Sequence, residues 1–196
     1  MADRAGLKAE LAALGSATEA GFEAGGADVE RISALAAALE ALSPTPGPAQ
    51  AAALMRGRWR LLWSSFGLQR DTTLARMSFN LLPKVPVRVE ALFQEVDPDT
   101  GLYDNIVTYT DATGLVGEAV TLGHYAPASE QRLDVVFTDA QASGYGRLAL
   151  DNAKIPPLWS DVVYLDNDFR LNRGSFGSLY ILALEERSPA GWARDA

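Results

Sequence analysis

Residues 164–182 read YLDNDFRLNRGSFGSLYIL, and they carry the clearest structural signal in the chain. Polar residues alternate here with Phe169 and Leu171, which is the period of a half-buried strand. Asp166-Asn167-Asp168 precede this strand, and Gly174 and Gly177 follow it; all are residue types that favour tight turns. The pattern predicts three strands joined by two turns, at residues 162–165, 168–172 and 179–184.

This stretch contains four charged side chains within eight consecutive residues: Asp166, Asp168, Arg170 and Arg173. One interpretation is a polar floor or mouth that binds the headgroup of a ligand through charge-assisted hydrogen bonds. The other is a structural network that fixes the last hairpin. Two negative and two positive charges cancel, so we favour the structural interpretation. Gly174 and Gly177 belong to the same expected structural motif.

From Gly57 onward the apolar pattern changes to a period of two. Turn-forming runs at residues 97–101 and 111–114 separate further alternating segments. We expect eight to ten short strands in hairpin order without helices between them, which is typical of an antiparallel sandwich or barrel. A closed barrel is favoured, because sequential hairpins close a sheet without exposed edges.

A lipocalin-like barrel has one recognisable device, a Gly-x-Trp at the start of its first strand with an arginine from late in the chain over the tryptophan. Gly57 and Trp59 fit the first part, and Arg170 or Arg173 the second. Such a cation–π contact is worth about 0.5–2 kcal/mol. The fold predicted is mainly β: a lipocalin-like antiparallel β-barrel with N-terminal α-helices packed against it.

The N-terminal part is alanine-rich and helical in pattern. Leu7, Leu11 and Leu14 form one apolar stripe, and a second stripe runs from Val29 to Leu42. Prolines after Ser43 end that helix, and a short helix is expected from Pro48 to Met55. We therefore expect, in one folded unit, a helical segment at 1–55, a barrel at 56–187 and a tail at 188–196.

Residues 164–180 follow the pattern Tyr-Leu-Asp-x-Asp-Phe-Arg-x-x-Arg-Gly-x-x-Gly-x-Leu-Tyr, which resembles the C-terminal signature of the plastid lipid-associated protein (fibrillin) family. The helix end at 38–44 and the run LMRGRWRLLWSS at 54–65 resemble the same family in the same order. Trp63 is a conservative departure, since family members often carry tyrosine there. The resemblance implies binding or transport of lipids, carotenoids or isoprenoid quinones, or a role in organising lipid particles, in a bacterial member of the family.

Composition and motif content argue against several other functions. A formal charge of −8 and a pI near 4.7 argue against a nucleic-acid partner. There are no cysteines, and the single histidine, His124, has no second metal ligand at strand or helix spacing. Arg56, Arg58 and Arg60 are read as a solvated strand face rather than an anion site. We expect no enzyme, no cofactor and no metal; an enzyme on the same barrel would need a polar cavity with His124 or an acidic pair.

Aromatic residues spread over the β region could line a pocket or simply fill the core, and the family resemblance favours the pocket. The candidate ligand-binding residues are Trp63, Phe79, Phe93, Tyr109, Tyr125 and Phe137. The expected function is non-catalytic binding or carriage of a hydrophobic small molecule in the barrel. The alternative is a scaffold protein with a filled barrel, whose helical face docks a protein partner or a lipid-particle surface.

Two apolar, proline-containing segments, at residues 81–87 and 155–159, would be unusual as surface connections. They either flank an open mouth and touch a membrane or lipid particle, or pack on the helices and cover the barrel. The N-terminus lacks the apolar core of a signal peptide, and no run reaches the roughly 18 apolar residues of a membrane span. We expect a cytoplasmic protein in peripheral contact with a membrane or lipid particle.

Overall fold

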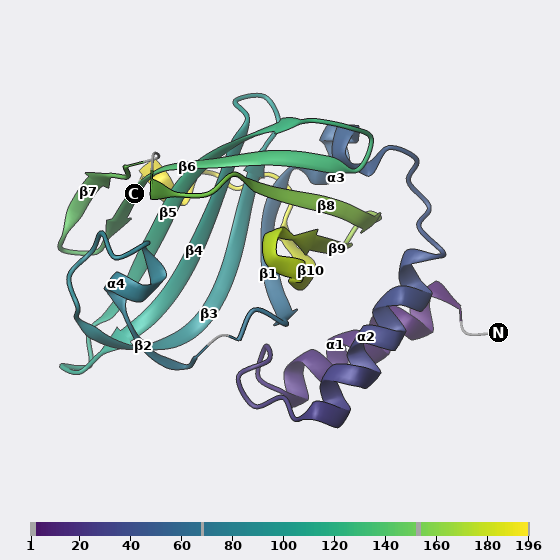
Figure 1. The fold of residues 1–196 in the computed structure, drawn as a ribbon, viewed down its shortest axis with the longest axis horizontal. Coiled ribbons are helices and arrows are strands. Elements are labelled where there is room, and N and C mark those ends of the chain that lie inside the picture. The colour runs from purple at the N-terminus through teal and green to yellow at the C-terminus, as the bar shows by residue number, and fades with distance from the viewer. Residues whose placement is uncertain (1–2, 68, 152–153, 196) are drawn as a thin grey trace.

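A computed structural model describes residues 3–67, 69–151 and 154–195, and within this part ten strands form one antiparallel sheet (Figure 1). The strands are β1 (Gly57–Ser64), β2 (Asp71–Thr73), β3 (Pro86–Asp97), β4 (Leu102–Asp111), β5 (Val116–Pro127), β6 (Arg132–Ala142), β7 (Gly146–Ala149), β8 (Leu158–Leu165), β9 (Phe169–Gly174) and β10 (Leu179–Glu186). The helices are α1 (Arg4–Ala17), α2 (Gly26–Glu40), α3 (Ala52–Met55) and α4 (Leu74–Met77), with 3₁₀ turns η1 (Pro48–Gln50), η3 (Ser175–Gly177) and η4 (Ala193–Asp195).

The sheet closes on itself. Its strands follow the order β1-β10-β9-β8-β6-β5-β4-β3, and β3 also pairs with β1 from Gly57 opposite Val96 to Arg60 opposite Phe93. The short strands β2 and β7 pair with the remaining ends of β3 and β6. The predicted mainly β fold, an antiparallel barrel with helices packed against it, is confirmed. All three predicted C-terminal strands are present as β8, β9 and β10.

Gly57 is required where the ring closes. Its φ is +131°, and a Cβ atom there would lie 2.4 Å from the carbonyl oxygen of Glu186 and 2.8 Å from a methyl group of Leu184. A side chain would therefore force β1 and β10 apart. This explains the glycine of the predicted Gly-x-Trp device.

Helices α1 and α2 pack side by side on the outer face of β1, β8, β9 and β10 (Figure 1). They contribute Leu7, Leu11, Ile32, Ala36 and Leu39 to this layer, each at most 4% exposed. The barrel side contributes Trp63, Val163, Tyr164, Phe169, Leu171, Leu179 and Ile181. The apolar stripe of α2 is thus used to cover the barrel. Only Leu42, beyond the helix, is exposed among the large apolar residues of that stripe.

The two ends of the barrel are closed by different elements (Figure 1). At one end, called the Trp59 end, η1 and α3 place Ala49 and Met55 against Trp59. At the other, the α4 end, α4 and the loop after it place Leu74 and Leu82 against the inner side of β3–β6. The prediction that no helix lies between the strands is wrong: Thr73 accepts a hydrogen bond from Arg76 N–H at 3.3 Å and caps a short apolar turn there.

The apolar run at residues 81–87 packs on the barrel. Leu82 and Val87 are buried, and Leu81 and Val85 pack beside them, so this run covers the barrel. No helix in the described part of the chain is long and apolar enough to cross a membrane. The boundaries at 55/56 and 187/188 fall between elements, and the division of the chain at these points stays a prediction.

Candidate functional site

The inside of the barrel is the first candidate site, because several of the predicted aromatic residues meet there. Tyr125 and Phe137 belong to the cluster that also holds Trp59, and the Tyr125 ring lies 5.9 Å from that of Tyr103. A Cβ atom at position 123 would lie 2.7 Å from the Phe137 ring, so glycine allows this ring to approach β5 closely. The inner wall is aromatic on this side.

Arg170 lies over Trp59 at the Trp59 end. Its guanidinium carbon is 4.7 Å from the ring centroid, and the Trp59 indole N–H donates to the Met55 carbonyl at 2.9 Å. The predicted stacking is confirmed, and the structure selects Arg170 rather than Arg173. Arg187 approaches the same ring from a second direction, at 5.6 Å.

The buried charge of Arg170 has no carboxylate partner within the residues that the structure describes. Its Nη2 donates to Gln94 Oε1, Nη1 lies 3.9 Å from the Met55 sulfur, and Nε has no acceptor. Burial is the main influence on this group, and it lowers the pKa of Arg170 from its ordinary value to about 10. The side chain therefore remains charged at neutral pH.

The expected network among Asp166, Asp168, Arg170 and Arg173 does not form. Asp166 and Asp168 both pair with Lys8 of α1, the former at 2.9 Å. Arg173 donates to Glu40 of α2 at 2.9 Å, while Arg170 turns inward. Alternate residues of β9 face opposite sides of the sheet, and this separates the two arginines. Three of the four charges thus hold helices on the barrel.

Asp166 is the most strongly perturbed carboxylate of this group. Burial raises its pKa, but hydrogen bonds from the Tyr164 hydroxyl at 2.6 Å and from Lys8 outweigh that effect and lower it to about 2. The Lys8–Asp166 pair borders a groove of about 530 Å³ between α1 and the β8–β9 turn. The groove is open and mixed in charge, which suits a structural contact better than an apolar ligand.

Solvent-accessible space lies inside the barrel. Asn105 of β4 pairs with Gln94 of β3 and Thr121 of β5, and the Gln94 amide donates to Asn105 Oδ1 at 3.0 Å. Gln94 itself reaches Arg170, so these side chains share the inner face. Asn105 is nevertheless exposed, and Gln94 and Leu92 are only half-buried. The interior beside Asn105 is therefore not filled by side chains.

The structure gathers four of the six predicted ligand-binding residues toward the interior. Tyr125 and Phe137 line it, and Tyr109 lies at the α4 end, 2% exposed, beneath Leu74. Phe79 follows α4, and its ring lies 5.9 Å from Phe137 while the residue stays 46% exposed. Phe79 thus lies between the interior of the barrel and the surface.

The other two candidates face outward. Trp63 lies in the layer under α1 and α2 and is 1% exposed. Phe93 packs on the outer surface, where the Arg58 guanidinium lies 4.4 Å from its ring and Ile106 is its neighbour on β4. Sequence reasoning missed Gln94, Tyr103, Asn105 and Asn172 on the inner wall. Asn172 donates to Ser160 at 2.9 Å, and its buried Oδ1 has no donor.

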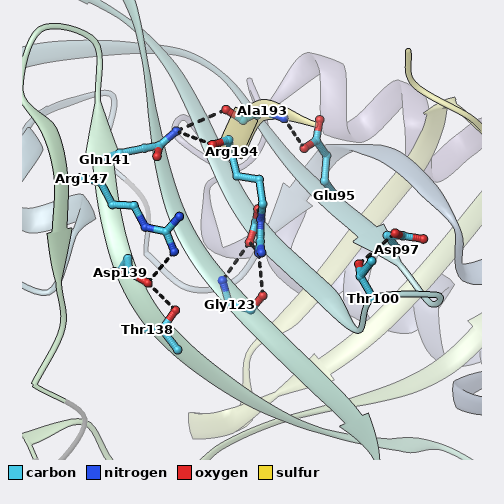
Figure 2. A network of polar contacts seen from close by, with 11 residues as sticks. Glu95, Asp97, Thr100, Gly123, Thr138, Asp139, Gln141, Arg147, Ala193 and Arg194 are labelled. Carbon is cyan, nitrogen blue, oxygen red and sulfur yellow. Dashed lines mark hydrogen bonds and ion pairs between the residues drawn. The ribbon is translucent and has the colours of Figure 1, made fainter. Parts of the chain in front are cut away.

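A second polar cluster lies on the outer face of β3–β6, beneath the C-terminal turn η4 (Figure 2). Arg194 donates to Asp104 at 2.7 Å and to the Gly123 carbonyl at 2.9 Å, and the Ala193 N–H donates to Glu95 at 2.8 Å. Both Glu95 and Asp104 are 0% exposed. Each hydrogen bond is local to this cluster, so it stabilises the tail on the barrel rather than forming a second pocket.

The carboxyl group of Glu95 predicts a pH dependence. Burial raises its pKa above 4.5, although the Ala193 N–H and Arg58 act in the opposite direction. Because the folded pKa exceeds the unfolded one, the folded protein binds more protons, and this group lowers stability as pH rises from 4.5 through the folded pKa. The melting temperature of Glu95→Gln minus that of wild type should therefore increase as the pH is raised from 4.5 to 8. A pH-independent difference between the two proteins would contradict this assignment.

The remaining polar residues offer little for catalysis. His124 is exposed on β5, and among the residues described no group of three or more His, Asp or Glu side chains could hold a metal ion. Arg56 and Arg58, read as a solvated face, pair instead with Asp97 at 2.6 Å and Glu95 at 3.2 Å. These ion pairs lie on the outer surface and do not contribute charged groups to the interior of the barrel.

The architecture and its interior define a closed antiparallel barrel with an aromatic inner wall and an outer helical layer. The chain belongs to the PAP_fibrillin family, whose model matches residues 5–144. That match includes the segments at 38–44 and 54–65 on which the resemblance was based, and it ends before the C-terminal signature at 164–180. No solved structure matches the chain.

The chain is also similar to curated plant proteins. It is 28% identical to the probable plastid-lipid-associated protein 3, chloroplastic, of Arabidopsis thaliana, over 87% of this chain and 56% of that protein. It is 26% identical to plastoglobulin-1, chloroplastic, of Pisum sativum, over 93% of this chain and 62% of that protein. The chain thus spans about three fifths of the length of these relatives. The first of these names refers to plastid lipid, and neither refers to a reaction. The expected bacterial origin stays a prediction.

Proposed function

We propose that this protein binds or carries a hydrophobic small molecule, such as a lipid, carotenoid or isoprenoid quinone, inside its barrel without catalysis. The observation that carries the proposal is the accessible inner face at Asn105, beside an aromatic wall that includes Tyr125 and Phe137. Burial of apolar ligand surface there would contribute roughly 25 cal/mol per Å². Membership of a family with lipid-associated relatives supports the same function.

Fluorescence titration with methyl cis-parinarate, a neutral polyene ester, tests the proposal. Asn105→Trp should fill the interior and weaken binding at least about tenfold. His124→Trp is the matched control, because it adds the same indole to an exposed position on the outer face of β5 and should leave binding unchanged. Equal binding by the wild type and both variants would place the probe outside the barrel and contradict the proposal.

The second part of the proposal is that the protein contacts a lipid surface and is located in the cytoplasm. Phe66 is 56% exposed and Phe176 is 75% exposed. They lie on neighbouring loops, because Ser65 N–H donates to the Leu179 carbonyl at 3.0 Å. Leu158 and Trp159, expected in such a loop, instead begin β8, and Arg132 covers the Trp159 ring at 4.3 Å. The exposed phenylalanines are therefore better suited to this contact.

We expect Phe66→Glu combined with Phe176→Glu to reduce co-sedimentation with phosphatidylcholine vesicles about tenfold, since two exposed rings that would enter the lipid are replaced by charges. Val136→Glu is the control, because Val136 is 52% exposed on the outer face of β6, away from these loops. Unchanged sedimentation of the double variant would show that these loops do not contact lipid.

A further inference from the structure

Arg170 brings a buried positive charge to the inside of the barrel, and no carboxylate in the described part of the chain pairs with it there. Among the residues that the structure describes, its only oxygen acceptor is the neutral amide of Gln94, and its buried Nε–H has no acceptor. The outward-facing Arg173 of the same strand, in contrast, has Glu40 as its partner. A buried guanidinium without a carboxylate costs stability, and an anionic oxygen supplied by a ligand would relieve that cost.

A polar path connects this charge to the open part of the interior. Asn105 is exposed there, and it accepts a hydrogen bond from the Gln94 amide at 3.0 Å. The same amide then reaches Arg170 through its carbonyl oxygen. Gln94 is half-buried, so its side chain lies between accessible space and the buried charge. A ligand group that enters beside Asn105 meets Gln94 first and Arg170 next.

We propose that Arg170, Gln94 and Asn105 form a headgroup site for a lipid that carries a single carboxylate, such as a long-chain fatty acid; this rests on the function proposed above. The carboxylate displaces the Gln94 carbonyl oxygen from Arg170, and Gln94 turns its amide N–H toward the new anion. The tail runs past Phe137 toward the α4 end, because Arg170 holds the headgroup at the Trp59 end, where Trp59 and Met55 leave no room for it.

A carboxylate fits this site better than the other polar heads of hydrophobic molecules. One buried cation balances one negative charge, and the flat carboxylate has two oxygens that match the guanidinium edge. A carboxylate forms an ion pair with Arg170, whereas a quinone or an alcohol would only replace the neutral oxygen of Gln94 with another neutral oxygen and therefore gains less. The proposal therefore ranks an acid above its own ester.

The test compares cis-parinaric acid with its methyl ester in fluorescence titrations of the intact protein. The wild type should bind the acid about 10–100-fold more tightly than the ester. Arg170→Met should lose this preference while it still binds the ester. Arg173→Met is the matched control, since it removes an arginine from the outer face of the same strand, and it should keep the preference.

Gln94→Glu gives a second test that does not remove the stacked arginine. Its carboxylate would stand within reach of Arg170 and take the place of the ligand's headgroup, so acid binding should fall to the level of the ester. Equal binding of acid and ester by the wild type, or a preserved preference in the folded Arg170→Met and Gln94→Glu variants, would overturn the inference and leave the function intact. Failure of both probes to bind the wild type would instead refute the function.

Discussion

Ile32→Asp should destabilise the protein by about 4 kcal/mol or more, because it places an unpaired carboxylate in a fully buried apolar position. Ile32 is 0% exposed and lies where α2 meets the barrel, in the layer that contains Phe169, Leu171 and Ile181. A helix that cannot bury its apolar stripe loses most of its stabilisation, since propensity alone supports short helices weakly. Detachment of α2 would also expose this part of the barrel and promote aggregation.

Thermal unfolding and limited proteolysis measure this effect. A loss of about 4 kcal/mol corresponds to a fall of roughly 10 °C or more in melting temperature for a chain of this size. Ser33→Asp is the control, because it introduces the same charge one residue further along, at an exposed position of the same helix. Similar melting temperatures for Ile32→Asp and Ser33→Asp would show that α2 does not depend on this contact.

Arg194→Met is expected to cost about 3–5 kcal/mol, since it leaves the carboxylate of Asp104 buried without its cation. The Asp104 side chain is 0% exposed, and among the described residues it accepts one hydrogen bond besides those from Arg194, from the Gly123 N–H at 2.8 Å. Loss of the arginine should also loosen η4 on the outer face, where Ala193 would keep its hydrogen bonds with Glu95 and Gln141 and its apolar contacts. Unfolding in urea should show the loss as a lower midpoint.

Two further variants identify the cause. Asp104→Asn in the Arg194→Met background keeps an acceptor for Gly123 but removes the buried charge, so it should recover much of the lost stability. Arg31→Met is the surface control: its pair with Glu10 is exposed, and exposed pairs are worth about 0–1 kcal/mol. An Arg194→Met protein as stable as Arg31→Met would contradict the account of the C-terminal turn.

Much of the fold could be predicted because its signals are local. Alternating residues and turn-forming runs predict strands, and the Gly57–Trp59 device with a late arginine predicts how the barrel closes. Arg170 fulfils that prediction with its guanidinium 4.7 Å from the Trp59 ring. The charge network was wrong because Lys8 and Glu40, which take up three of the four charges, lie more than a hundred residues away.

The candidate site was harder to predict because β-bulges change which face a residue occupies. Counting by twos from Trp59 places Trp63 on the inner face, but a register shift between Leu61 and Trp63 turns it outward. The same happens on β3, where a shift between Val89 and Ala91 places Phe93 outside and Gln94 inside. No residue type in these strands marks either bulge.

Polar residues on the inner wall were missed for a different reason. Sequence reasoning sought an apolar pocket and therefore selected aromatic residues. Asn105 and Gln94 occupy inner positions because β4 and β3 pair in this register, and only their partner across the barrel, Arg170, gives them a role. Tertiary pairing of this kind has no signal within a single strand.

The most direct test of the central claim is mass spectrometry of lipid retained by the folded protein. Wild-type protein, Asn105→Trp and His124→Trp would each be incubated with the same total lipid extract, purified again and extracted. The account predicts a hydrophobic molecule at a ratio near one per chain in wild type and His124→Trp, and its loss in Asn105→Trp. Equal retention by all three proteins, or none by any of them, would contradict a ligand site inside the barrel.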